Sequence, residues 1–192
     1  MNILREVSLG QFYFEIAMLL REAMFLSVLL FNGETWLNIT QAEMQELESL
    51  DKTLLRRIVS APISSPVCSL YAELGCSPVR FLIQAKRIKF LHYILTRKEE
   101  DLVSKVFWVQ KDHPVKNDFY STVAKDLEAF GIEMTFQEIK EYKIEDFKSF
   151  VSDRMNQTAL EYLNSLKDNL SKDGQCGVQL WKKSSVPSWM SK

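Results

Sequence analysis

The chain has 192 residues, of which 46% are hydrophobic, and a formal net charge of −1. This length and apolar content are sufficient for a buried core, as one domain or as two small ones. Six glycines and five prolines are too few for a sheet architecture of this size, because hairpins need frequent turn residues. We therefore expect an all-α fold, a multi-helix bundle of about seven helices with a flexible C-terminal tail.

No membrane or secretory segment is expected. The most apolar run, residues 23–33, is about half as long as the ~20 residues that a membrane span requires. No signal-type apolar segment with a small-residue cleavage site follows the N-terminus, which argues against secretion. The three cysteines are an odd number without paired spacing, as is typical of a reducing compartment. These features predict an intracellular protein, nuclear or cytoplasmic.

The first predicted helix spans residues 11–31. This segment contains no Pro or Gly, and its apolar side chains recur at spacings of three and four, which predicts a long, deeply buried helix that Gly33 closes. Because the helix is apolar over most of its circumference, it needs partners on all sides. We expect the isolated chain to be marginally stable and to expose apolar surface that favours association.

Three helices are expected between residues 40 and 97. Thr40 and Glu43 have the spacing of a capping box, ahead of a helix that stops before Pro62. Two Ser-Pro pairs, at residues 65–66 and 77–78, each predict a serine N-cap followed by a proline at the first helical position. The period of the last helix turns its apolar residues inward and its cations outward; the cations are Arg80, Lys86, Arg87 and Lys89.

The C-terminal part of the chain shows the same signals. Acidic residues 99–101 precede a helix that His113 and Pro114 end. A cap at residues 117–118 begins the next helix, which Gly131 closes. A second capping box follows at Thr135 and Glu138, and then a long helix from Ile144 to about Leu170. We divide the chain into a helical region with a basic centre (1–98), a C-terminal helical region (99–171) and a disordered tail (172–192).

Charge is distributed very unevenly. Residues 52–98 contain nine Lys and Arg against the single carboxylate of Glu73, whereas residues 1–51 and 99–170 each sum to −6. This basic centre either meets phosphates at a surface or pairs with the acidic flanks inside the fold, and both interpretations stay open. The candidate nucleic-acid-binding residues are Arg56, Arg57, Arg80, Lys86, Arg87 and Lys89.

No residue set predicts catalysis. His92 and His113 lie in different elements without a suitably spaced nucleophile, and we expect His92 to be partly exposed beside the basic helix face. Cys68, Cys76 and His92 match no zinc-ligand spacing. The isolated glycines form no phosphate-binding loop. We therefore predict no catalytic residue, no metal, no cofactor and no small-molecule substrate.

Several short motifs in a fixed order resemble a known family. They are the turn at residues 32–36, then Leu47, Asp51, Leu54, Leu55 and Arg56, then residues 71–75 and Pro78, and finally Arg80, Arg87, Leu91 and Tyr93. From about Gly10 to Ser171, this order resembles the segment downstream of the polymerase in non-LTR retrotransposon reverse transcriptases. The resemblance implies a thumb-like and post-thumb helical region that grips the template and primer backbone beside a palm.

The chain departs from this family in one decisive respect. The family's palm carries a Tyr-x-Asp-Asp-like signature, and no adjacent aspartate pair occurs here. Because polymerisation needs two metal ions held by such carboxylates, we expect this chain alone to be no enzyme. Its expected partners are an RNA or DNA backbone and the missing palm region. The alternative function is a helical protein-interaction or scaffold domain without nucleic-acid binding.

Overall fold

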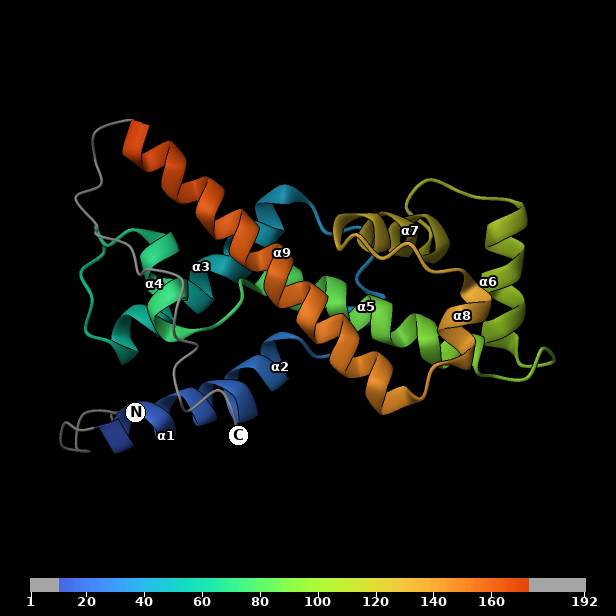
Figure 1. Ribbon diagram of the computed structural model, residues 1–192, viewed down its shortest axis with the longest axis horizontal. Coiled ribbons are helices and arrows are strands. Elements are labelled where there is room, and N and C mark those ends of the chain that lie inside the picture. The colour runs from blue at the N-terminus through green and yellow to red at the C-terminus, as the bar shows by residue number, and fades with distance from the viewer. Residues whose placement is uncertain (1–10, 173–192) are drawn as a thin grey trace.

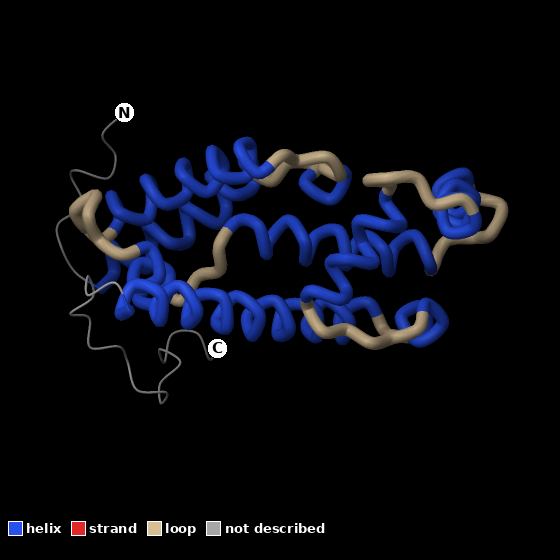
Figure 2. Tube along the Cα trace, turned by 90° about the horizontal axis from the view of Figure 1, so that it is seen from above, coloured by secondary structure: helices blue, strands red, loops and turns tan. Residues whose placement is uncertain are grey.

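The computed structural model describes residues 11–172, and all regular elements within them are helices (Figures 1 and 2). The predicted all-α fold is thereby confirmed. The predicted tail lies outside the described residues except for Lys172, which ends the last helix. No helix in the described part of the chain combines the length and the hydropathy needed to cross a membrane.

The N-terminal elements form one continuous rod. It consists of α1 (Gln11–Leu20), a wider π-helical turn η2 (Arg21–Leu26) and α2 (Ser27–Leu29). The rod ends at Leu29. In the turn that follows, Asn32 has a φ of 52°, a left-handed conformation that Asn tolerates better than most residues. The prediction that Gly33 closes the helix is wrong, because Leu30 is the C-cap of α2 and Gly33 instead begins the 3-10 turn η3 (Gly33–Thr35).

The next three helices are α3 (Gln41–Ile58), α4 (Val67–Leu74) and α5 (Val79–Leu95). The predicted capping box of α3 is confirmed, because the Thr40 hydroxyl accepts from the Glu43 N–H and the Glu43 carboxylate accepts from the Thr40 N–H. The predicted serine caps of α4 and α5 are wrong. Pro66 and Pro78 occupy the N-cap positions themselves, with extended ψ angles, so each helix begins one residue later than predicted.

The C-terminal half contains α6 (Leu102–Asp112), α7 (Phe119–Ala129), α8 (Phe136–Glu141) and α9 (Ile144–Lys172). Asp118 caps α7, and the second capping box, at Thr135 and Glu138, is confirmed. Gly131 follows α7 with a φ of 58°, as expected for a residue that ends a helix in the left-handed region. Local side-chain chemistry thus determines where these helices begin and end.

The helix α5 lies at the centre of the molecule, and α9 crosses it diagonally (Figure 1). One buried cluster joins α5 to α6, α7, α8 and the first half of α9. A second cluster joins α1, α3 and α4 to the far half of α9 through Leu163. Because α9 contributes to both clusters, it ties the two ends of the elongated molecule together. The division at residues 98 and 99 stays a prediction.

Candidate functional site

Four of the nine cations of the basic centre form ion pairs with the acidic flanks: Lys52, Arg80, Lys86 and Arg87. Glu48 on α3 accepts hydrogen bonds from Arg80 Nε at 2.5 Å and from Lys52 Nζ at 3.2 Å. The Arg80 guanidinium also lies 5.2 Å from the centroid of the Tyr162 ring. This is a favourable cation–π arrangement. Arg80 is therefore half-buried between α3 and α9 and does not extend freely into solvent.

Arg87 is buried, so the prediction that it faces solvent or a ligand is wrong. Its residue is 7% exposed, and its guanidinium donates to both carboxylate oxygens of Asp126 at 2.6 and 3.0 Å. A third bond reaches the backbone oxygen of Trp36 at 3.0 Å. Helical period alone placed Arg87 on an outer face, but η3 and α7 pack over that face of α5. Arg87 thus links three elements of the fold.

Lys86 and Lys89 also have partners within the fold. Lys86 Nζ donates to the backbone oxygen of Leu30 at 2.8 Å and lies 3.8 Å from the Glu34 carboxylate. Lys89 Nζ donates to the Ser152 hydroxyl at 2.9 Å, and among the described residues no carboxylate lies within ion-pair distance of it. Burial lowers the pKa of Lys89, and the positive charge of Lys148 lowers it further.

The remaining two predicted residues lie at the end of α3. Arg56 is half-buried and donates to the backbone oxygen of Ser65 at 3.4 Å, whereas Arg57 is exposed. The six candidate residues are therefore spread from the end of α3 along α5 and do not converge on one surface. For Arg80, Lys86 and Arg87, the structure brings together cations and acidic flanks, which is the second of the two interpretations that the sequence left open.

A further buried ion pair, which sequence reasoning did not identify, joins the N-terminal rod to α3. Arg21 in the π-helical turn donates to both oxygens of Asp51 at 2.8 and 2.9 Å, and the Tyr71 hydroxyl donates to the same carboxylate at 3.1 Å. Burial and the Asp51 charge raise the pKa of Tyr71, which keeps its hydroxyl protonated as a donor. Burial also raises the pKa of the neighbouring Cys76 thiol to about 12.

His92 is buried, so the prediction that it is partly exposed is wrong. Its Nε2–H donates to the backbone oxygen of Tyr142 at 3.0 Å, and its ring stacks on Phe147 at 5.0 Å. The loop between α8 and α9 covers this side of α5, which helical period could not reveal. Within residues 11–172, no three His, Cys, Asp or Glu side chains are grouped as metal ligands would be.

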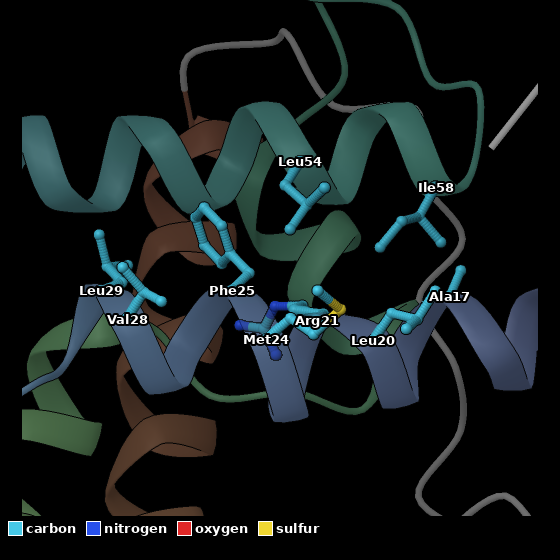
Figure 3. Close-up of a pocket in the computed structure, with 9 residues that line it drawn as sticks. All are labelled: Ala17, Leu20, Arg21, Met24, Phe25, Val28, Leu29, Leu54 and Ile58. Atoms are coloured by element: carbon cyan, nitrogen blue, oxygen red, sulfur yellow. The ribbon is translucent and has the colours of Figure 1, made fainter. Parts of the chain in front are cut away.

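An apolar groove lies between the N-terminal rod and α3 (Figure 3). It has a volume of about 520 Å³, and aliphatic and aromatic side chains form nearly all of its wall. Met24 and Val28 on the rod are 65% and 78% exposed. We call this the rod–α3 groove; its lining residues are Ala17, Leu20, Arg21, Met24, Phe25, Val28, Leu29, Leu54 and Ile58.

The groove shows why the predicted burial of the first helix is only partly correct. Ala17, Met18, Arg21 and Leu30 are buried, but several large apolar residues on the other faces of the rod remain in contact with solvent. The sequence did indicate incomplete burial of this helix, because residues 11–31 are apolar over most of the helix circumference and such a helix needs neighbours on all sides. What the sequence did not show was which face would stay open.

Comparison with known proteins gave no relative. The chain matches no protein-family model, no curated protein and no solved structure.

The acidic partner of Arg80 gives a prediction on pH dependence. Burial disfavours the Glu48 carboxylate, but the hydrogen bonds and charges of Arg80 and Lys52 outweigh it and lower its pKa. A lowered folded-state pKa contributes stability that is present above the ordinary value of 4.5 and is lost as pH falls through the folded value. We expect Glu48→Gln to reduce the free energy of unfolding by about 1–3 kcal/mol at pH 7. Urea unfolding between pH 7 and pH 3 should show this difference shrinking on acidification; a difference independent of pH would contradict the assignment.

Proposed function

We propose that this chain is a non-catalytic helical interaction domain that packs against another protein surface through the rod–α3 groove. The observation that carries the proposal is the rod–α3 groove itself: it is almost entirely apolar, and its exposed Met24 and Val28 have no cover in the described residues. By contrast, four cations of the basic centre, Lys52, Arg80, Lys86 and Arg87, are already paired with carboxylates inside the fold. Exposed apolar patches of this kind are typical of protein-binding sites. A nuclear or cytoplasmic location belongs to the same proposal.

A binding assay with an apolar fluorescent dye tests this proposal. The dye should bind the wild-type chain at low protein concentration, and Met24→Lys combined with Val28→Lys, both in the groove, should remove most of the fluorescence. Both side chains are more than half exposed, so the fold should tolerate the change. Ile63→Lys, on an exposed loop away from the groove, is the matched control and should leave dye binding unchanged. Dye binding that survives the groove substitutions would contradict the proposal.

A second candidate function, contact with a nucleic-acid backbone beside a palm region, is supported by a strip that runs along the C-terminal part of α5 and ends just beyond it. Lys89, Tyr93 and Arg97 recur at four-residue spacing, and the Arg97 guanidinium lies 4.2 Å from the Tyr93 ring centroid. Neither cation has a carboxylate within ion-pair distance among the described residues. Cations interleaved with an exposed aromatic ring are typical of surfaces that bind phosphates and stack bases. The resemblance to the reverse transcriptase segment agrees with this candidate.

Salt dependence separates the two candidates. If the strip contacts phosphates, the slope of log affinity against log salt should be about −0.7 to −0.9 per contact. Replacing Lys89 and Arg97 by Gln should then flatten the slope by roughly one and a half units. Lys125→Gln changes an exposed cation on α7 that is not among the candidate binding residues, and it serves as the control. Binding to single-stranded RNA or DNA that is absent even at low salt would leave the interaction domain as the better proposal.

A further inference from the structure

A second hollow lies nearer the N-terminal end of α3, and its lining shares no residue with the rod–α3 groove. This hollow is lined on α3 by Glu43, Glu46, Leu47 and Leu50. Leu47, Leu50, Leu54 and Ile58 follow one another at spacings of three and four, so all four lie on one face of α3. From Glu43 to Ile58 this face is about 22 Å long at 1.5 Å per residue. A surface of this length and shape suits an amphipathic helix of about three turns.

The same chain exposes a helix with the complementary surface. Leu102, Val106 and Val109 on α6 lie at spacings of four and three, on one face of the helix, and each is exposed. Leu102 is 76% exposed, although the helix as a whole packs on α5 and α7. The helix has 11 residues and is therefore about 16 Å long, which fits within the length of the α3 face.

The rod and α3, which form the groove, lie towards one end of the long axis of the molecule, and α6 lies at the other end (Figure 1). A rigid chain therefore cannot place its own α6 in its own groove. A second copy can do so, because nothing in the described residues covers the outer face of α6. Such a contact joins two different surfaces and is heterologous, so it leaves one groove and one α6 free at the ends of every open assembly.

The charges at the two ends favour one orientation of the helix in the groove. Glu43 and Glu46 lie at one end of the α3 face and the exposed Arg57 at the other. The segment around α6 begins with Glu99, Glu100 and Asp101 and carries Lys111 and Lys116 towards its other end. An antiparallel arrangement of α6 and α3 brings opposite charges together at both ends, whereas a parallel one brings like charges together.

We propose that the rod–α3 groove binds the exposed face of α6 from a second copy of this chain, giving a head-to-tail assembly. The proposal rests on the function proposed above and names the partner of that surface. In the assembled state Leu102, Val106 and Val109 face Ile58, Leu54 and Leu50. The α6 helix runs antiparallel to the α3 helix that receives it.

The decisive experiment mixes two variants that each lack one surface. The groove variant carries Met24→Lys and Val28→Lys, and the α6 variant carries Val106→Lys and Val109→Lys. All four side chains are exposed, and circular dichroism checks that both variants remain helical. Light scattering coupled to size-exclusion chromatography then gives the molar mass over a range of concentrations. The wild type should grow in mass with concentration, and each variant alone should stay monomeric.

An equimolar mixture of the two variants should form a one-to-one dimer and nothing larger, because only one intact groove and one intact α6 remain. Leu160→Lys, which changes an exposed apolar residue on α9, should associate like the wild type. A mixture that stays monomeric, or an α6 variant that associates by itself, overturns the head-to-tail contact. A wild type that is monomeric at every concentration also overturns it. If the groove substitutions still remove dye binding from such a monomeric wild type, the proposed interaction function stands without the head-to-tail assembly. If they do not, the proposed function and the assembly are both wrong.

Discussion

Replacing Arg87 by methionine is expected to lower the free energy of unfolding by about 3–5 kcal/mol. The substitution leaves the Asp126 carboxylate, which is 3% exposed, without the guanidinium that donates to both of its oxygens. It also removes the donor to the Trp36 carbonyl. An uncompensated buried charge is among the most costly changes in a folded protein. Urea unfolding followed by circular dichroism at pH 7 measures the loss.

Two comparisons make this result specific. Arg97→Met changes an exposed arginine near the end of the same helix and should shift the free energy of unfolding by no more than about 0.5 kcal/mol. The double variant Arg87→Met with Asp126→Leu removes both charges and should recover most of the loss. If Arg87→Met and Arg97→Met had equal effects, or if the double variant were the sum of two losses, the buried ion pair would not have the role assigned to it.

The helix boundaries were predictable because the signals that set them are local. Thr40 and Thr135 each bond to a glutamate three residues further along, and Asp118 accepts from the backbone N–H of Ser121. Such interactions lie within one turn and can be read from residue spacing alone. The two Ser-Pro pairs show the limit of this reasoning, since a proline can take the cap position itself and displace the serine from it.

The ion pairs were not predictable, because they join residues far apart in the chain. Arg87 and Asp126 are 39 positions apart, and Arg21 and Asp51 are 30 apart. Pairing of cations with carboxylates across segments was one of the two interpretations of the uneven charge, but the charge pattern did not identify the partners. Helical period misplaced Arg87 and His92 for a related reason. It assumes that a helix is buried on one face, whereas η3, α7, α8 and α9 surround α5.

The existence of an uncovered apolar surface was predictable from the sequence, but the position of the groove was not. The apolar circumference of residues 11–31 predicted that part of the first helix would lack cover, and the exposed Met24 and Val28 agree with that expectation. The position of the groove depends on the angle at which the rod meets α3. The Arg21–Asp51 pair fixes this contact, because it is the buried polar link between the two helices. The stability of this pair and the shape of the groove are therefore coupled.

Replacing Asp51 by asparagine tests that coupling and is expected to lower the free energy of unfolding by about 3–5 kcal/mol. The asparagine side chain offers one acceptor oxygen where the carboxylate offers two, and it leaves the buried Arg21 guanidinium without a counter-charge. The Tyr71 hydroxyl competes for the oxygen that remains. Thermal and urea unfolding measure the loss, and Asp153→Asn, at an exposed position on α9, is the matched control with an expected change of no more than about 0.5 kcal/mol.

The double variant Arg21→Met with Asp51→Asn separates the charge effect from general loss of packing. Removing the guanidinium eliminates the unpaired buried charge, so the double variant should be more stable than Asp51→Asn alone. Because Arg21 lines the groove, the single variant Asp51→Asn should also loosen the rod from α3 and raise dye binding above that of the wild type. A double variant that is less stable than Asp51→Asn would show that an unpaired Arg21 charge is not the cause of the loss. Dye binding that is unchanged in both variants would show that the pair does not hold the rod against α3.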